Sequence, residues 1–363
     1  MIEPGLTRRR SIQYLASLPA AASLLPAQEN VGESPGRIAP LADLVNVFEV
    51  QAMARRKLPE NVYAAIAGTD RRAFERITFR PRLMVNVAQL DLTTELLGEK
   101  MFTPIVVGPT WYQQAFHPDG EIAMARGASA AKTLMVVSSR SSRPLQEILS
   151  EAKTPLWFQV YPEPDIKSTI HAAQEAVRAG CKAVCLTIGV PYQAPGPGGQ
   201  ISNPVRMQAT GGMKMDWTVI DRISQSVKAP VVLKGIMSPE EAKLAAARGI
   251  QAIVVSNHGG LFTSGFAEPI AVLPSIAQAV GGKIPILIDG SFRRGTDILK
   301  ALALGARAVL LARPPVWGLA AYGAEGVQAV LEMLQSELAR NMAHCGKPDI
   351  KSIDSSLVKI HKR

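Results

Sequence analysis

Two residues at the ends of apolar runs are suited to acid–base chemistry. Lys234 follows the run Pro230 to Leu233, and His258 lies within Ser256-Asn257-His258-Gly259-Gly260. A lysine that ends a buried strand is partly desolvated and can stabilise a developing anion. A histidine in such a place is suited to act as a general base near neutral pH, although a lone histidine more often has a structural role. We therefore expect Lys234 and His258 to be catalytic residues.

A second group of residues is typical of a phosphate site. Asp289-Gly290-Ser291-Phe292-Arg293 follows one apolar run, and Arg313 follows the next. Glycine lets backbone N–H groups approach phosphate oxygens, and arginine adds charge-assisted hydrogen bonds. The alternative is that these arginines only solvate the rim of a cavity. Because two successive runs end in the same chemistry, we expect a phosphorylated ligand.

These residues can form one site only if the C-terminal ends of their strands lie close together. From Pro104 onward, short β-branched apolar runs alternate with polar turns and amphipathic stretches, which predicts parallel strands joined by helices. An open doubly wound sheet is the alternative, but no G-x-G-x-x-G motif follows the first run. We expect an α/β fold, a (β/α)8 TIM barrel with a short N-terminal helical extension and an active site at the C-terminal strand ends. The predicted strands are residues 104–108, 133–137, 156–160, 183–188, 230–233, 252–255, 285–288 and 308–311.

Residues 1–27 are typical of an export signal. Arg8, Arg9 and Arg10 precede an apolar, alanine-rich stretch that ends near Ala27, and this stretch is too short to span a bilayer. The arginine pair resembles a twin-arginine signal, which directs folded proteins out of the cytoplasm. We therefore expect a periplasmic protein without stable membrane insertion after processing. The alternative is a basic tail on a cytoplasmic enzyme.

The composition favours one large domain. The chain has 363 residues, of which 47% are hydrophobic and 19% charged, so it is long enough for a single barrel. We assign residues 28–40 to a linker, 41–346 to the barrel and 347–363 to a C-terminal tail. The net charge of +10 is dispersed, so we expect no nucleic-acid partner. Cys181, Cys185 and Cys345 lack the spacing of a metal site and are expected to pack as small hydrophobic residues.

Several motifs occur in a fixed order between about Leu41 and Gly346. They include Phe79-Arg80-Pro81-Arg82, His117-Pro118-Asp119-Gly120-Glu121, Phe158-Gln159-Val160-Tyr161 and the Ser-Asn-His-Gly-Gly run. In combination they resemble the FMN-dependent 2-hydroxy-acid oxidase and dehydrogenase family, which includes glycolate oxidase, lactate oxidase and lactate or mandelate dehydrogenases. The resemblance implies FMN as cofactor and His258 as the group that takes a proton from the substrate. It also implies a set of flavin-binding residues, namely Thr110, Ser138, Gln159, Thr187, Lys234, Asp289, Gly290, Arg293 and Arg313.

The chain departs from this family at the substrate pocket, which makes it a divergent member. Leu261 stands where the family usually has a carboxylate-binding arginine, and the loop after Thr187 lacks the second such arginine. Gly189 aligns with the aspartate that normally partners the histidine, and Ala65 lies near the position of a tyrosine. Because a neighbouring carboxylate supports the charged form of a histidine, an unpaired His258 is expected to be a weaker base.

One further departure from the family, at Arg140, supplies an arginine that could replace the missing carboxylate-binding arginines. Arg140 aligns with a position that is usually aromatic and lines the substrate pocket, and an arginine there can bind an anion from a different wall. Arg140 and Tyr161 are the predicted substrate-binding residues. The alternative is that Arg140 lies at the rim of the cavity and faces the solvent. Trp111 and Tyr112 either reshape the pocket or only pack its mouth.

The leading hypothesis is an FMN-dependent oxidoreductase that acts on a 2-hydroxy acid or a related secondary alcohol. Its electron acceptor is oxygen, a quinone or a cytochrome, and family members are commonly homo-oligomers, tetramers or larger. A second hypothesis is a flavin-binding barrel with an altered substrate or without turnover, which serves as a binding or electron-relay module. A third is a phosphate-binding barrel isomerase that uses no flavin.

Overall fold

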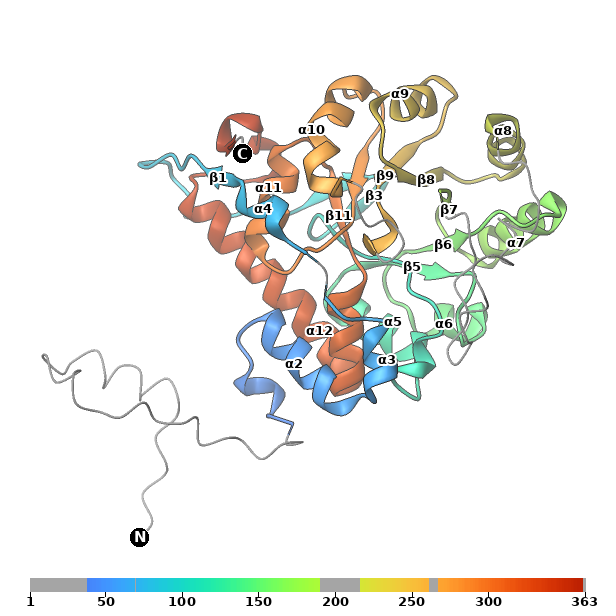
Figure 1. The fold of residues 1–363 in the computed structure, drawn as a ribbon, viewed down its shortest axis with the longest axis horizontal. Helices are drawn as coiled ribbons and strands as arrows, with labels where there is room; N and C mark the ends of the chain where they lie inside the picture. The colour runs from blue at the N-terminus through green and yellow to red at the C-terminus, as the bar shows by residue number, and fades with distance from the viewer. Residues whose placement is uncertain (1–37, 69, 190–215, 261–266, 362–363) are drawn as a thin grey trace, which may run out of the picture. The chain divides into compact units, whose positions relative to one another are not determined.

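The computed structural model describes residues 38–68, 70–189, 216–260 and 267–361. In these ranges, eight parallel strands close into a barrel in the order β10-β11-β4-β5-β6-β7-β8-β9 (Figure 1). Each strand coincides with one of the predicted runs to within a few residues, so the predicted TIM barrel is confirmed. The strands are β4 (Ile105–Val107), β5 (Leu134–Ser138), β6 (Leu156–Val160), β7 (Val184–Thr187), β8 (Val231–Ile236), β9 (Ala252–Val255), β10 (Ile286–Ile288) and β11 (Ala308–Leu311).

Helices follow the strands and surround the barrel, as a right-handed β-α-β repeat requires. The long helix α12 (Arg313–His344) packs against α5 and the N-terminal α2 (Figure 1). Its course is interrupted at Gly323, whose φ of 63° is accessible to glycine at no steric cost. The other helices are α5 (Glu121–Ala130), α6 (Leu145–Glu151), α7 (Ile166–Ala179), α8 (Trp217–Ser226), α9 (Pro239–Ala247), α10 (Pro269–Val280) and α11 (Gly295–Ala303).

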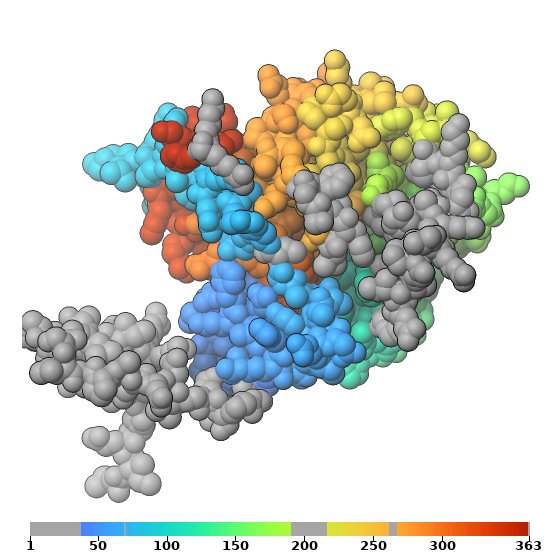
Figure 2. Space-filling view, in the orientation of Figure 1, coloured from blue at the N-terminus to red at the C-terminus, as the bar shows by residue number. Residues whose placement is uncertain are grey.

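Short helices precede the barrel, which confirms the predicted N-terminal extension. They are η1 (Leu41–Asp43), α2 (Val47–Lys57), α3 (Glu60–Ala64) and α4 (Arg72–Glu75). Asn46 caps α2 because its side chain accepts hydrogen bonds from the N–H groups of Phe48 and Glu49. The blue surface in Figure 2 belongs to this extension. Across the described ranges, no helix combines the length and the apolar character that a bilayer span requires.

Two small antiparallel pairs complete the structure. The hairpin of β2 (Thr94–Leu96) and β3 (Glu99–Met101) turns at two residues with positive φ, as a tight hairpin turn requires. Leu96 and Met101 from this hairpin join the apolar cluster inside the barrel. The second pair joins β1 (Ile77–Phe79) to β12 (Val358–Ile360), after η6 (Ile350–Ser352) and η7 (Ser355–Leu357).

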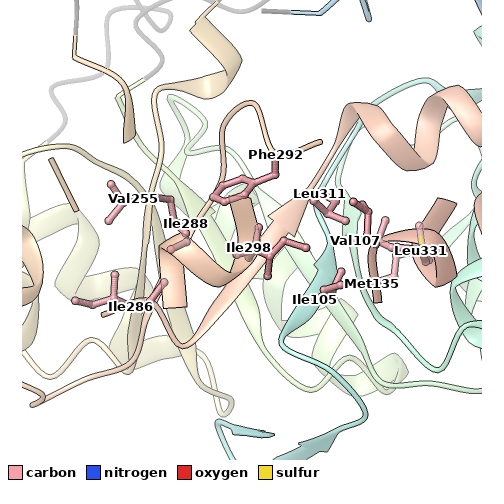
Figure 3. Packing of buried hydrophobic residues seen from close by; sticks show 14 of the residues in the cluster. Ile105, Val107, Met135, Val255, Ile286, Ile288, Phe292, Ile298, Leu311 and Leu331 are labelled. Carbon is pink, nitrogen blue, oxygen red and sulfur yellow. The ribbon is translucent and has the colours of Figure 1, made fainter. Parts of the chain in front are cut away.

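Each barrel strand is buried on both faces, as expected for a parallel sheet covered by helices. In β5, Leu134 and Val136 belong to the cluster inside the barrel, whereas Met135 and Val137 belong to the larger cluster beneath the helices. The outward side chains of β10 and β11 lie beside Ile298 of α11 (Figure 3). The alternation between the two clusters fixes which residues face inward at the barrel mouth.

Candidate active site

The two-residue period of the strands brings the predicted site residues to the inner face of the barrel. Trp157 lies inside the barrel, so Gln159, two residues later on β6, points inward at the mouth. The same step leads from Val136 to Ser138 on β5 and from Val232 to Lys234 on β8. A single cavity at the mouth is lined by Thr110, Arg140, Tyr161, Thr187, Lys234, His258, Asp289, Gly290, Arg293 and Arg313, among others.

A chain of buried polar groups crosses three neighbouring strands. The Ser138 hydroxyl donates to Gln159 Oε1 at 3.0 Å, and Gln159 Nε2 donates to Thr187 Oγ1 at 2.9 Å. All three side chains are buried. On the neighbouring β4 loop, Thr110 Oγ1 accepts a hydrogen bond of 2.7 Å from Gln113 Nε2. The residues predicted to bind the flavin ring therefore lie in order around one side of the mouth.

Lys234 on β8 is held by an acidic partner, Asp289, which follows β10, two strands further along the barrel. Its Nζ lies 2.9 Å from Asp289 Oδ2 and donates to Ser256 Oγ at 2.8 Å. The Ser256 hydroxyl in turn donates to Asp289 Oδ2 at 2.8 Å. Burial lowers the pKa of Lys234, but the charge and hydrogen bond of Asp289 outweigh burial, so this pKa is raised. Sequence analysis did not assign a role to Ser256, although its place at the end of β9 was a usable signal.

His258 lies in a confined space formed by two glycines. A Cβ at Gly235 would lie 3.1 Å from the imidazole, and one at Gly189 would lie 3.5 Å from its Nε2. Burial, and to a smaller extent the charge of Lys234, lowers the pKa of His258 to about 4, against an opposing effect of Asp289. Sequence analysis attributed the weak base to the missing aspartate, whereas the structure makes burial the largest cause. The imidazole is therefore neutral at neutral pH.

The predicted phosphate residues lie together at the ends of β10 and β11. Arg293 is 3% exposed, and its Nη1 donates to the Phe292 carbonyl at 2.7 Å. Its guanidinium lies over the Trp317 ring, 4.4 Å from the centroid. Burial, together with the charges of Arg313 and Arg71, lowers the pKa of Arg293 to about 9. Several guanidinium groups that repel one another in a buried place form an anion site.

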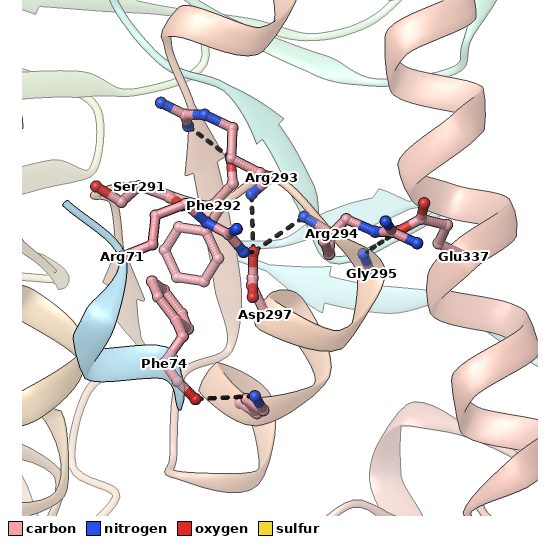
Figure 4. A network of polar contacts seen from close by, with 10 residues as sticks. Arg71, Phe74, Ser291, Phe292, Arg293, Arg294, Gly295, Asp297 and Glu337 are labelled. Carbon is pink, nitrogen blue, oxygen red and sulfur yellow. Dashed lines mark hydrogen bonds and ion pairs between the residues drawn. The ribbon is translucent and has the colours of Figure 1, made fainter. Parts of the chain in front are cut away.

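A polar network holds the loop that carries Arg293 (Figure 4). Asp297 Oδ2 accepts hydrogen bonds from the backbone N–H groups of Arg293 and Arg294, at 2.9 and 3.0 Å. It also forms an ion pair of 2.6 Å with Arg71 from the N-terminal extension, and Arg71 Nε donates to the Ser291 carbonyl at 3.2 Å. Sequence analysis missed Arg71, because nothing in its local sequence shows that it reaches this loop.

The far side of the cavity carries the predicted substrate-binding residues. The Arg140 guanidinium lies over the Tyr161 ring, 4.5 Å from the centroid. In the described parts of the chain, no carboxylate forms an ion pair with Arg140. Trp111 lines the same cavity, whereas Tyr112 does not and instead packs edge to face against Trp111. Arg140 is thus a pocket residue rather than an arginine at the outer rim.

Two buried polar atoms without protein partners test whether FMN fits. Arg293 Nη2 and Asp289 Oδ1 are buried and have no hydrogen-bond partner among the residues that the structure describes. A phosphate oxygen would satisfy the first and a ribityl hydroxyl the second. Gly290, with φ 105°, adopts a backbone conformation that L side chains rarely reach. The residues present therefore fit a flavin mononucleotide: Arg293 would hold its phosphate, and Lys234, Ser138, Gln159 and Thr187 would hold its ring.

The fold and the site together define a class of protein. It is a TIM barrel with an anion site at the ends of its last two strands, a polar platform for a ring, and a neutral histidine at the mouth. A family model for FMN-dependent dehydrogenases matches residues 54–196 and 197–360. The chain belongs to the FMN-dependent 2-hydroxy-acid oxidase and dehydrogenase family.

Individual relatives agree with this assignment. The chain is 36% identical to a peroxisomal (S)-2-hydroxyacid oxidase of Arabidopsis thaliana, over 87% of this chain and 96% of the relative. It is also 36% identical to an L-lactate oxidase of a Nostoc strain, over 86% and 98% of the two chains. A mandelate oxidase crystal structure with (S)-2-phenylpropionate aligns with a TM-score of 0.81 and 33% identity, over 88% of this chain and all of that chain.

A flavocytochrome b2 mutant aligns with a TM-score of 0.82 and 28% identity, over 89% and 88% of the two chains. The predicted family and FMN as its cofactor are thereby confirmed, and FMN-dependent oxidation of 2-hydroxy acids is the reaction of this family. The isomerase hypothesis, which uses no flavin, is wrong. Leu261 and most of the loop after Gly189, like the export signal 1–27, lie outside the described residues.

Proposed function

We propose that this protein oxidises an anionic 2-hydroxy acid to the 2-oxo acid, and that Arg140 binds an anionic group of the substrate. The observation that carries the proposal is the Arg140 guanidinium, which stacks on Tyr161 in the cavity that also contains His258. Since the usual carboxylate arginines are replaced at Leu261 and after Thr187, Arg140 is a cation in the cavity wall that can bind an anionic group of the substrate.

His258 and Lys234 have separate roles in this reaction. Oxidation of the alcohol removes two electrons and two protons from the substrate. The neutral His258 imidazole accepts the hydroxyl proton. FMN, when bound, takes up the electron pair together with the proton from the hydroxyl-bearing carbon. Lys234 stays cationic because Asp289 raises its pKa by more than burial lowers it. Lys234 therefore keeps a positive charge at the flavin side of the mouth.

Substitution of Arg140 tests the proposal. Loss of a charge-assisted hydrogen bond costs about 1.5–3 kcal/mol, so Arg140→Ala is expected to raise the apparent substrate constant about tenfold to a hundredfold. The measurement is the rate of anaerobic bleaching of the bound flavin against substrate concentration. An unchanged constant would contradict the proposed role. A flavin that no 2-hydroxy acid bleaches would instead favour the binding or electron-relay module.

The acceptor and the assembly belong to the same proposal. Oxygen, a quinone or a cytochrome takes the electrons from the reduced flavin, and a homo-oligomer, tetrameric or larger, is the expected form. Support comes from the family, in which both oxidases and a flavocytochrome occur. Turnover with oxygen alone, compared with turnover in the presence of a quinone analogue or a cytochrome, distinguishes the acceptors. Size-exclusion chromatography with light scattering measures the assembly.

A further inference from the structure

The position of Arg140 on the wall of the barrel limits which anionic group of a substrate Arg140 can bind. Arg140 follows β5, and His258 follows β9. In the closed strand order, three strands separate β5 from β9 in either direction, so the two residues rise from opposite walls of the mouth. For eight strands with ordinary spacing and tilt, opposite walls lie about 15 Å apart.

The Arg140 side chain stays on its own side of the cavity. Its guanidinium lies 4.5 Å from the ring centroid of Tyr161, which follows the adjacent strand β6. This cation–π contact ties the guanidinium to the side of the mouth from which Tyr161 projects. The tight turn from Ser138 to Ser141 supports this placement, because Ser141 N and Oγ both donate to the Ser138 carbonyl.

The substrate chemistry then decides which anion Arg140 binds. In any 2-hydroxy acid, the carboxylate carbon is bonded directly to the hydroxyl carbon, so a base on the hydroxyl and a cation on that carboxylate must lie close together. His258 and Arg140 lie on opposite walls. A hydroxyl held at His258 therefore places the neighbouring carboxylate on the side of the mouth opposite the strand that carries Arg140, whereas a group at the other end of a short chain extends toward Arg140.

The other cations of the mouth are engaged or assigned differently. Lys234 is paired with Asp289. Arg313 donates to the carbonyls of Ala67 and Gly259, at 2.9 and 3.0 Å, and Arg293 lies at the phosphate site. Arg140 has no ion-pair partner among the residues that the structure describes. A cation without a counter-ion in a cavity wall is a site for an anionic part of the ligand.

We propose that Arg140 and Tyr161 form a distal anion subsite, and that the preferred substrate is a 2-hydroxy acid with a second anionic group at the far end of a short carbon chain, such as a 2-hydroxydicarboxylate. This inference rests on the proposed function of the site. It goes further because it names which of two carboxylates Arg140 binds.

A pair of substrates matched in length tests the inference. 2-Hydroxyglutarate and 2-hydroxypentanoate have the same carbon chain and differ in the terminal group, a carboxylate in the first and a methyl in the second. For the purified flavin-loaded chain, we expect anaerobic bleaching by 2-hydroxyglutarate at an apparent substrate constant at least about tenfold lower. Arg140→Ala is expected to remove this preference and to leave the constant for 2-hydroxypentanoate within about twofold.

Arg143→Ala is the matched control for charge and loop position. Arg143 lies three residues further along the same loop, contacts the Pro118 carbonyl and Glu147, and does not line the cavity. This variant is expected to keep the preference for the dicarboxylate. Arg140→Lys serves as the second variant if Arg140→Ala does not fold. Calorimetric titration with glutarate, which has no hydroxyl to oxidise, reports the subsite without turnover.

Each outcome separates the two proposals. Loss of the dicarboxylate preference and of glutarate binding in Arg140→Ala supports both. If Arg140→Ala raises the apparent substrate constant equally for both substrates, Arg140 binds the carboxylate next to the hydroxyl, and the distal subsite is overturned. Unchanged constants for both substrates overturn the distal subsite and the proposed function together.

Discussion

At the scale of single residues, the mouth separates two kinds of anion site. Arg293 is buried, has an unsatisfied Nη2 and repels Arg313 and Arg71, which suits a permanently bound phosphate. Arg140 is only half-buried and stacks on Tyr161, which suits a ligand that must enter and leave. The difference in burial is therefore consistent with the proposed roles, in which Arg293 binds the cofactor and Arg140 the substrate.

The pKa of His258 predicts an unusual acid limit for activity. A base must be neutral to accept a proton, and the pKa of His258 is lowered to about 4 by burial and by Lys234, against the opposing charge of Asp289. The rate of flavin reduction is therefore expected to stay high as the pH falls through 6.5 and to decrease only near pH 4. Stopped-flow pH jumps, with substrate in excess, measure this profile.

Acid exposure must be short in that experiment. Because the pKa of His258 is lower in the folded chain than its ordinary value of 6.5, the unfolded chain binds this proton more readily below pH 6.5. Stability from this residue therefore decreases as the pH falls from 6.5 toward 4. Flavin fluorescence monitors loss of the cofactor. A decrease in rate centred near pH 6.5 with the flavin still bound would contradict the prediction.

A carboxylate restored beside His258 is expected to move the acid limit upward. A Cβ at Gly189 would lie 3.5 Å from His258 Nε2, so Gly189→Asp is expected to raise the acid limit by about one pH unit or more. Because φ at Gly189 is 78°, any side chain there adds strain of about 1 kcal/mol. Gly189→Asn has the same shape and strain without the charge, and it is expected to leave the acid limit unchanged.

At the scale of elements, one buried carboxylate ties two loops of the mouth together. Glu121, the first residue of α5, is fully buried. Its Oε1 accepts hydrogen bonds from Gln113 N and Ser142 N, both at 3.0 Å, and its Oε2 accepts from Ser142 Oγ at 2.6 Å. Gln113 belongs to the loop after β4 and Ser142 to the loop of Arg140. Glu121 therefore fixes the two loops to each other.

Two variants of Glu121 are expected to show how much of its effect on stability comes from the hydrogen bonds to the two loops. Glu121→Ala leaves Gln113 N and Ser142 N without acceptors and is expected to lower the free energy of unfolding by about 3 kcal/mol. Glu121→Gln keeps an oxygen for both N–H groups and can donate to Ser142 Oγ, so a loss of about 1 kcal/mol is expected. Urea denaturation measures both. Equal losses in the two variants would show that the hydrogen bonds to the loops do not matter.

At the scale of the whole molecule, the site is assembled from residues that are far apart in the chain. Thr110 follows the first barrel strand and Arg313 follows the last. Only closure of the barrel brings β11 beside β4 and makes these ends neighbours. The N-terminal extension contributes as well, since Arg71 bonds the loop that carries Arg293.

Export of the folded molecule remains a prediction from residues 1–27. Substitution of Arg9 and Arg10 by lysine keeps the charge but breaks every arginine pair in Arg8-Arg9-Arg10. We expect the unaltered chain to be found with its flavin in the periplasmic fraction and the substituted chain to remain in the cytoplasm. Immunoblots of cell fractions with markers for both compartments measure this. An unaltered chain that stays in the cytoplasm would favour the alternative of a cytoplasmic enzyme with a basic tail.

The sequence by itself determined the barrel and the approximate place of the site. Apolar runs such as 252–255 need burial on both faces, and a parallel sheet covered by helices is the arrangement that supplies it. The polar residues at the ends of these runs, such as Ser138 and Lys234, also indicated the mouth of the barrel as the place of the site.

The tertiary structure alone decided which of these residues act on one another. Lys234 on β8 is paired with Asp289 after β10, and Arg140 follows the strand opposite the one that His258 follows. Both facts depend on the order in which the barrel closes. The pKa of His258 depends chiefly on burial, which is a property of all the packed neighbours together. Local sequence specifies the chemistry of each side chain, whereas charge pairing and desolvation depend on distances through space that only the closed barrel sets.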